Sequence, residues 1–198
     1  KDGMFVLGDE EKDKEVFALR PMTCPFQYQA YLNRKRSYRD LPLRYNETST
    51  LFRNEASGEM HGLIRVRQFT ISEGHLMCTP EQLEDEFRKC LELAIFMLKT
   101  LGLYEDVSYR FSQWDPNDRA KYIGTEEQWN EAQGLMERIL NHLEIPYEIG
   151  IGEAAFYGPK LDIQIKNVYG KEDTLITIQI DQMLAEQFGI CLLYTSPS

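Results

Sequence analysis

The sequence predicts an α+β domain in which an antiparallel β-sheet is flanked by helices. Two long segments, residues 80–101 and 126–145, carry apolar residues at a helical period. Segments in which apolar and polar residues alternate lie before and after these helices, and short turns join them. Helices grouped between such strands are typical of α+β folds, whereas regular strand–helix alternation indicates a parallel sheet.

The first third of the chain is predicted to contain short strands and one short helix. Residues 16–19 have the composition of a strand, and Pro25 fits the first turn of a helix over residues 26–37. Residues 43–45 and 49–53 are predicted strands that lead into a hairpin, whose loop at 56–62 is rich in small and turn-forming residues. The hairpin is expected to return through a strand that includes residues 65–69.

Both long helices have signals at their ends. Thr79 is a natural N-cap before Pro80, and Gly102 ends that helix. Thr125 opens a capping-box sequence that Gln128 completes. Further strands are predicted at residues 108–112, 161–165 and 175–180, with a turn at 167–173. The helical side chains expected to face the core are Leu83, Phe87, Leu91, Ile95, Leu98, Trp129, Ala132, Leu135, Ile139 and Leu143.

The composition is that of one folded domain in a reducing compartment. The chain has 198 residues, of which 42% are hydrophobic, enough for a sizeable core. No apolar run is long enough to span a bilayer, and the first residues do not have the pattern of a secretory signal. The four cysteines are scattered without a C-x-x-C pair, so a cytoplasmic setting without a disulfide framework is expected.

The charge is unevenly distributed along the chain. The net charge of −10 argues against a broad nucleic-acid-binding surface. Residues 33–68 nevertheless contain eight basic and four acidic residues, so this window carries a charge of +4. A local positive site on an acidic chain suits a small phosphate-bearing ligand better than a long duplex.

The predicted hairpin carries the side chains that such a ligand requires. Along one strand, Arg53 and Glu55 would project to the same face. Along the other, Arg65, Arg67 and Phe69 would share a face. Arginine binds phosphate oxygens through a planar fork of donors, an aromatic ring stacks on a base, and a carboxylate accepts from an exocyclic amine. The pattern predicts a nucleotide-triphosphate site, and the alternative is a solvated hairpin whose arginines pair with nearby acids.

The same residues resemble motif 2 of the class II aminoacyl-tRNA synthetases in their threonyl form. Three further segments agree with that family in order and spacing: residues 20–25 (RPMTCP), His75, and residues 155–160 (AFYGPK) followed by 177–179 (TIQ). The resemblance covers about residues 1–188 and implies a class II catalytic domain that is incomplete, running from after motif 1 to before motif 3. Residues 189–198 depart from it and are expected to be a non-native or disordered tail.

The resemblance implies ATP-dependent activation of threonine and its transfer to tRNA(Thr), with Mg²⁺ accompanying ATP. Arg53 would bind the α-phosphate as the threonine carboxylate attacks, and Arg65 would bind the outer phosphates. Glu55 would accept from the adenine amino group, Phe69 would stack on the ring, and Gln179 would contact ATP as well. The dimer-forming motif 1 helix and the motif 3 arginine are expected outside this chain. The chain alone is therefore expected to be inactive, and a homodimer is expected of the longer protein.

The resemblance also implies a threonine pocket that contains Zn²⁺. Cys24 and His75 would be two of the three protein ligands, and the third, a histidine, is expected beyond the chain. In the family the open metal positions receive the amino and hydroxyl groups of threonine, which excludes valine. The pocket residues are expected to be Met22, Glu73, Tyr157, Lys160 and Gln179. Ile71 and Glu73 depart from the usual family residues, although Glu73 keeps a carboxylate. His142 is expected to be a surface residue.

Two other interpretations stay open. The chain could belong to a sister class II enzyme, seryl or prolyl, although residues 22–25 and His75 argue against both. It could instead be a synthetase-like module that binds tRNA or regulates without catalysis. The presence of Arg53, Glu55, Arg65 and Phe69 together favours catalysis.

Overall fold

The computed structural model describes residues 3–181 and 183–190. They form two compact units, residues 3–77 and the described residues from 78 to 190. The single domain expected over residues 1–188 stays a prediction, and most of the expected tail, residues 191–198, lies outside the described residues. No helix in the described part of the chain is long and apolar enough to cross a membrane.

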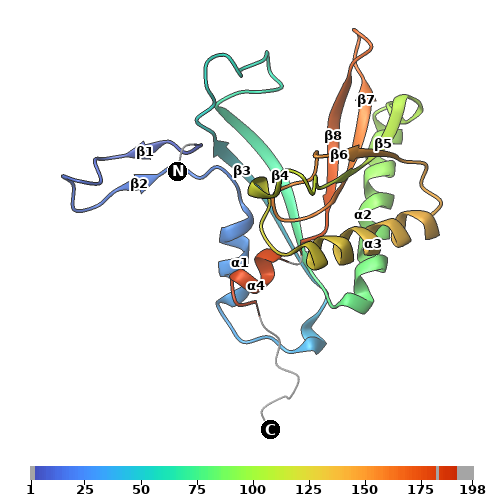
Figure 1. Ribbon diagram of the computed structural model, residues 1–198, viewed down its shortest axis with the longest axis horizontal. Helices are drawn as coiled ribbons and strands as arrows, with labels where there is room; N and C mark the ends of the chain where they lie inside the picture. Colours follow the sequence, from blue (N-terminus) through green and yellow to red (C-terminus); the bar gives the residue numbers. More distant parts are fainter. Residues whose placement is uncertain (1–2, 182, 191–198) are drawn as a thin grey trace. The chain divides into compact units, whose positions relative to one another are not determined.

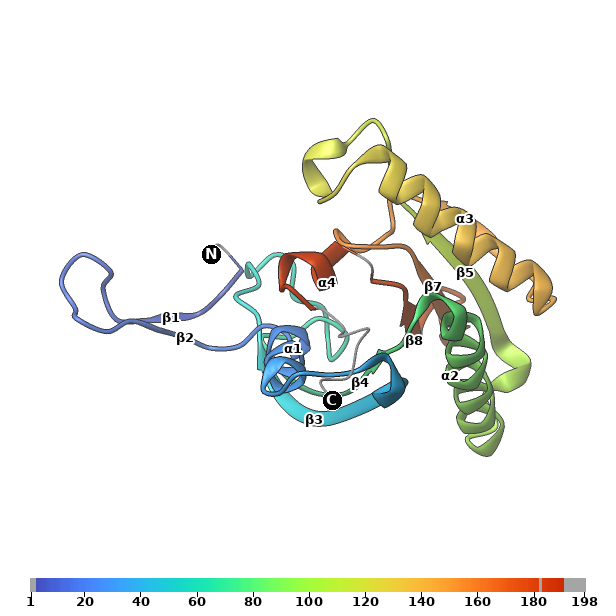
Figure 2. The same ribbon diagram turned by 90° about the horizontal axis from the view of Figure 1, so that it is seen from below.

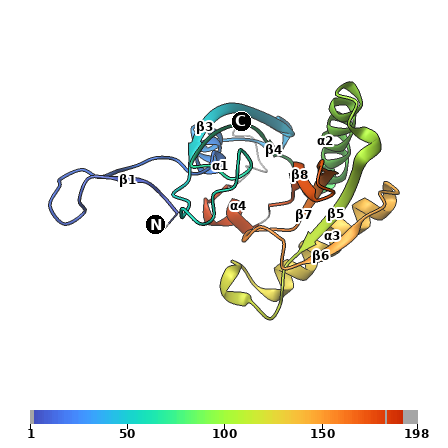
Figure 3. The ribbon, with the colours of Figure 1, turned by 90° about the horizontal axis from the view of Figure 1, so that it is seen from above.

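The first unit contains two antiparallel hairpins and a helix (Figure 1). β1 (Val6–Leu7) pairs with β2 (Phe17–Ala18), and β3 (Leu43–Phe52) pairs with β4 (Gln68–Met77) along its whole length. The helix α1 (Cys24–Leu32) lies against the β3–β4 hairpin (Figures 1 and 3). One continuous strand thus replaces the two short ones predicted between residues 43 and 53.

Helix α1 begins at Cys24 and ends at Leu32, whereas the sequence predicts a helix over residues 26–37, and a separate turn begins at Ser37. The Ser37 hydroxyl accepts a hydrogen bond from the Arg39 N–H at 3.3 Å. The Asp40 carboxylate accepts one from the Ser37 N–H at 2.8 Å, and the two bonds cap the 3₁₀ helix Tyr38–Asp40. A capping residue has an extended backbone, so Ser37 cannot also continue the preceding helix.

The second unit is built on a four-stranded sheet. Its strand order is β6 (Glu148–Ile151), β5 (Val107–Gln113), β7 (Lys160–Lys166) and β8 (Glu172–Gln179). β5, β7 and β8 pair antiparallel as predicted, whereas β6, which the sequence pattern did not reveal, pairs parallel with β5. Parallel neighbours need a crossover, and α3 (Glu126–His142) supplies it, running alongside β5 (Figure 2). A short helix, α4 (Met183–Gln187), follows the sheet.

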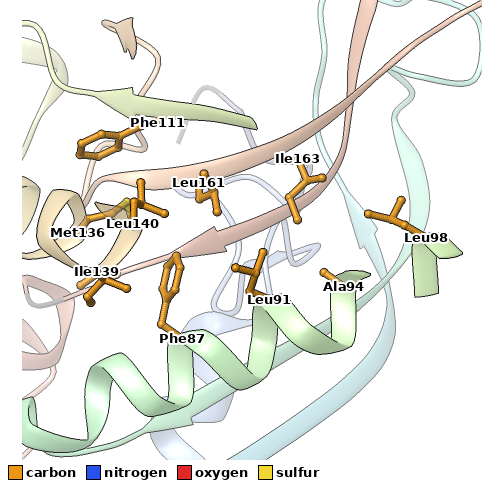
Figure 4. Packing of buried hydrophobic residues seen from close by; sticks show 11 residues of the cluster. Phe87, Leu91, Ala94, Leu98, Phe111, Met136, Ile139, Leu140, Leu161 and Ile163 are labelled. Atoms are coloured by element: carbon orange, nitrogen blue, oxygen red, sulfur yellow. The ribbon is translucent and has the colours of Figure 1, made fainter. Parts of the chain in front are cut away.

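The core of the second unit lies between the sheet and the helices α2 (Pro80–Thr100) and α3. On β7, Leu161 and Ile163 point into this core, so Asp162 between them is directed to the opposite face of the sheet. The predicted positions Leu83, Ile95, Leu135 and Leu143 are partly buried at the core's edge. Trp129 is buried elsewhere, stacked on Trp114 with ring centres 5.5 Å apart. The buried side chains of this core include Ile180 and those labelled in Figure 4, namely Phe87, Leu91, Ala94, Leu98, Phe111, Met136, Ile139, Leu140, Leu161 and Ile163.

Gly158, just before β7, is a place where two backbone segments meet. A Cβ atom added there would overlap the carbonyl oxygen of Ile180, which cannot move without the chain around it. We expect Gly158→Ala to lower the free energy of unfolding by about 1–3 kcal/mol, measured by urea denaturation. The matched control is Gly134→Ala in α3, where the new methyl would lie 3.5 Å from the Arg138 side chain. The control is expected to gain about 0.5–1 kcal/mol from helix propensity, and an unchanged stability of Gly158→Ala would contradict the close approach.

Candidate active site

Arg53 follows the last residue of β3 and lies beside the ring of Phe69 on β4. Its backbone N–H donates to the Arg67 carbonyl oxygen at 2.9 Å, so the main-chain pairing continues for one hydrogen bond beyond the ends of β3 and β4. Its Nε donates to the Pro21 carbonyl oxygen at 3.2 Å, and its guanidinium carbon lies 5.0 Å from the Phe69 ring centre. These contacts hold an exposed guanidinium over an aromatic face, and among residues 3–181 and 183–190 they leave the two terminal nitrogens of its fork for an anion.

Glu55 and Arg65 form an ion pair across the hairpin loop. Arg65 Nε lies 3.2 Å from Glu55 Oε2, with the Glu55 side chain 15% exposed and the Arg65 side chain 55% exposed. Arg67 Nε donates to the main-chain oxygen of Glu55 at 3.0 Å, so Glu55 is held at both ends. With Arg65 largely in solvent, such a pair contributes about 0–1 kcal/mol to stability, and phosphate oxygens could therefore attract Arg65 at little cost. We call Arg53, Glu55, Arg65 and Phe69 the hairpin cluster.

The prediction that strand alternation assembles this cluster is wrong. β3 ends at Phe52 and β4 begins at Gln68, so of the cluster Phe69 alone lies on a regular strand. The Glu55 N–H donates back to the Arg53 oxygen at 2.9 Å, and the Arg65 N–H donates to the His61 oxygen at 3.1 Å. At these positions tight turns take the place of the hydrogen bonds between strands that the prediction assumed. The loop's own hydrogen bonds therefore bring the cluster together.

Two contacts hold the start of α1 against the face of β4 that carries Glu73 and His75. The buried Thr23 donates its hydroxyl proton to the Glu73 carboxylate. The Tyr28 ring packs edge-on against His75 with ring centres 5.7 Å apart. Cys24 begins α1 between these two contact points, and Met22 is half-buried just before them. The structure thus brings the predicted metal and pocket residues of this unit toward one face of β4.

The donor types of Cys24 and His75 fit the predicted metal, since Zn²⁺ binds thiolate sulfur and imidazole nitrogen. Zinc sites use three or four protein ligands, however. Within residues 3–181 and 183–190, no group of three or more His, Cys, Asp or Glu side chains could hold a metal ion. Cys24 and His75 would therefore need at least one ligand from outside the described chain.

Tyr157, Lys160 and Gln179 come together in the second unit. Lys160 and Gln179 are paired residues of β7 and β8, so their side chains emerge side by side on one face. The Tyr157 hydroxyl donates to the Gln179 side-chain oxygen. Lys160 Nζ lies 2.8 Å from Asp162 Oδ2. The three residues assigned to the threonine pocket in this unit are thus neighbours.

Sequence reasoning missed the side chains that hold these residues in place. Asp162 binds Lys160, and Thr23 binds Glu73. A signal existed for Asp162, because an acidic residue between two core-facing residues of a central strand must find donors when it is buried. Thr23 carried no signal of its own, since its partner is fifty positions away on β4. His142 is a surface residue as predicted, 75% exposed, with Nδ1 2.5 Å from Glu84 Oε1.

Comparison with known proteins now identifies the family. The sequence profile of the tRNA synthetase class II core domain, shared by the G, H, P, S and T enzymes, matches residues 5–196. The chain belongs to this family. A crystal structure described as the RNA binding domain of threonyl-tRNA synthetase from Cryptosporidium parvum superposes with a TM-score of 0.84 at 34% identity. The match covers 96% of this chain and 45% of that one.

Curated relatives point to one branch of the family. The chain is 69% identical over 190 residues to a threonine–tRNA ligase of Clostridium botulinum and 67% identical over 190 residues to that of Clostridium perfringens. Each match covers 96% of this chain, and the chain spans about 30% of the length of these relatives. The similarity therefore concerns a segment of the class II core.

Cys78, three residues after His75, is predicted to be an unreactive thiol. Burial raises the pKa of Cys78 from its usual value of 9.0 to about 11, and Glu86 and Cys90 act in the same direction. At pH 8 this leaves about a hundredfold less of the thiolate that reacts with alkylating agents. We expect iodoacetamide to modify Cys78 about a hundredfold more slowly in the folded chain than in urea, measured by peptide mass mapping. Equal rates in the two states would contradict the burial.

Proposed function

We propose that this chain is part of the catalytic core of a threonine–tRNA ligase. Such an enzyme forms threonyl-adenylate from ATP and threonine and transfers threonine to the 3′ end of tRNA(Thr). The hairpin cluster carries the proposal, because it combines a phosphate-binding fork, a stacking ring and a carboxylate acceptor. The proposal extends to a longer, homodimeric, cytoplasmic protein that binds tRNA(Thr).

In the first step the threonine carboxylate attacks the α-phosphorus of ATP and pyrophosphate leaves. Negative charge develops on the α-phosphate oxygens, and a fixed guanidinium stabilises it. Arg53 suits this role because Pro21 and the Phe69 ring already hold its side chain. A donor positioned in advance loses little entropy on binding, and the step needs no covalent intermediate on the enzyme.

The rest of the hairpin cluster is assigned to the rest of the nucleotide. Phe69 stacks on adenine, Glu55 accepts from the adenine amino group, and Arg65 binds the outer phosphates. Because Glu55 and Arg65 lie 3.2 Å apart, their pairing restrains two long side chains before ATP arrives. Mg²⁺ bound with ATP would neutralise part of the phosphate charge.

Contacts with threonine are proposed for residues of the first unit and, separately, for residues of the second. In the first, Glu73 supplies a carboxylate that Thr23 orients, and Met22 supplies an apolar wall. In the second, Lys160 and Gln179 offer polar groups side by side, and the Tyr157 hydroxyl fixes Gln179 for contact with both threonine and ATP.

Cys24 and His75 are proposed to hold Zn²⁺ with a third ligand from beyond the chain. The bound metal would supply open coordination positions for the amino and hydroxyl groups of threonine. A valine side chain has nearly the same shape but offers no hydroxyl, so a site built around that group rejects it.

Threonine-dependent ATP–pyrophosphate exchange tests the proposal. Since the chain spans about 30% of its relatives, the assay uses a graft in which this chain replaces the matching 190 residues of the Clostridium perfringens ligase. We expect exchange with threonine, exchange about 10–200-fold weaker with serine, and exchange roughly 10⁴-fold weaker with valine. Exchange driven by another amino acid would assign the chain to a sister synthetase. A folded graft without exchange would favour the non-catalytic module.

Variants of the graft separate the role of Arg53 from general charge effects. Arg53→Gln is expected to lower kcat for exchange by about 10²–10³-fold, the usual effect of removing one transition-state donor. The matched control is Arg39→Gln, which removes an exposed guanidinium that contacts Tyr38 outside the hairpin cluster. Equal losses in both variants would contradict the assignment of Arg53.

Zinc content tests the assignment of Cys24 and His75. After gel filtration the graft is expected to retain about one zinc ion per chain by mass spectrometry of the metals, because three protein ligands complete such a site. Cys24→Ala and His75→Ala are each expected to lose it, since two remaining ligands hold the ion too weakly. Cys90→Ala, on α2, is the control and should retain zinc. Full zinc content in Cys24→Ala would refute the ligand assignment.

A further inference from the structure

The face of the four-stranded sheet opposite the helices carries a buried carboxylate. Asp162 is 2% exposed, although its neighbours on β7, Leu161 and Ile163, point the other way into the apolar core. A carboxylate removed from water is costly unless donors surround it. The hydrogen-bond donors around Asp162 therefore indicate the role of this buried carboxylate.

Three side chains from three strands meet the Asp162 carboxylate. The Ser112 hydroxyl on β5 donates to Oδ2 at 2.6 Å, and the Thr177 hydroxyl on β8 donates to Oδ1 at 2.8 Å. Lys160 Nζ, from β7 itself, lies 2.8 Å from Oδ2. We call these four residues the Asp162 network. Its two hydroxyls fix the carboxylate on both oxygens, and the carboxylate in turn holds the ammonium.

Stability alone does not account for this arrangement. A buried ion pair contributes little net stability, because desolvation of the charges offsets their attraction, and apolar residues of similar volume often do as well. The Asp162 side chain is 3% exposed, yet the Lys160 side chain is 22% exposed. The Lys160 side chain is therefore partly open to solvent, while the carboxylate that binds it is enclosed.

We infer that Asp162 is the positioning residue for Lys160, with Ser112 and Thr177 locking its carboxylate. This inference rests on the proposed function, in which Lys160 belongs to the threonine site. Lysine has a long flexible side chain, so an unrestrained ammonium would lose rotamer freedom on each binding event. An ammonium has three N–H donors, so one can remain on Asp162 while the others meet the substrate.

The charge of the pair has a second consequence. Asp162 compensates the positive charge of Lys160, so the site presents directed hydrogen-bond donors with little net charge. Such donors recognise the position of a carboxylate or carbonyl oxygen without attracting every anion. Gln179, paired with Lys160 across β7 and β8, extends the same surface with a neutral amide.

Competitive acylation of lysines tests the inference on the chain itself, without any need for activity. Acetic anhydride at trace level labels Lys160 and Lys166, and Lys166 is an exposed internal standard on the same strand. We expect Asp162→Asn to raise the labelling rate of Lys160 relative to Lys166 by about fivefold or more, since the ammonium loses its partner. An unchanged ratio in a folded Asp162→Asn chain would overturn the inference.

Hydroxyl variants keep the test decisive if Asp162→Asn fails to fold. Thr177→Val removes one donor to Asp162 at constant shape and is expected to raise Lys160 labelling about twofold or more. Thr177→Ser keeps the hydroxyl and should restore the original rate. Thr174→Val makes the same change on β8 opposite Gln164, away from Asp162, and should leave the rate unchanged. Equal effects of the two valine variants would overturn the inference.

Kinetics in the graft then show whether the position of Lys160 matters for the substrate. Asp162→Asn is expected to raise the KM for threonine about tenfold and to leave the KM for ATP within about twofold. If Asp162 acts through Lys160, adding Asp162→Asn to a Lys160→Gln graft should have no further effect on the threonine KM. A further tenfold rise in the threonine KM of the double variant would overturn the claim that Asp162 acts through Lys160. Loss of exchange in the unsubstituted graft would instead refute the proposed function, and the labelling result would stand independently.

Discussion

Strand β7 is buried on both faces, and the structure of the second unit depends on the packing partners of one face and the hydrogen-bond donors of the other. Its apolar side chains need partners of matching shape, which α2 and α3 provide. Its buried carboxylate needs donors in fixed directions, and these come from Ser112 on β5 and Thr177 on β8. A slip of either neighbour by one residue would turn its donor to the wrong face. The polar contacts therefore specify the register that places Lys160 beside Gln179.

In the first unit, the regular β3–β4 hairpin provides the support, and the candidate binding side chains lie mostly outside its paired residues. The β3–β4 hairpin pairs without interruption along ten residues, so it is a stiff support. Most of the hairpin cluster lies just beyond the paired region, where turns direct the side chains. Loops on a rigid support commonly carry binding residues, because the loop sets direction and the support sets position. The contacts of Thr23 and Tyr28 fasten α1 to the same support.

The partners of the arginines distinguish their functions. Arg20 lies 2.6 Å from the Glu47 carboxylate, so its charge is compensated within the unit. Arg53 is held by a carbonyl oxygen and an aromatic ring, neither of which carries a negative charge. Its orientation is fixed while its positive charge stays available to an anion. This difference supports Arg53 as the phosphate-binding residue within a window of mixed charge.

The sequence by itself determined the features that depend on residues close together in the chain, such as helix ends and short motifs. Caps at Thr79 and Thr125, with apolar residues at a helical period, placed the starts of α2 and α3 correctly, whereas α3 ends at His142, before the predicted residue 145. The order of motifs indicated the family and the types of side chain at the site. Only the tertiary structure decided the parallel pairing of β6, the turns that gather the hairpin cluster, and the donors around Asp162. The physical reason is distance along the chain: Ser112 and Asp162 are fifty residues apart, and their hydrogen bond exists only in one register of a folded sheet.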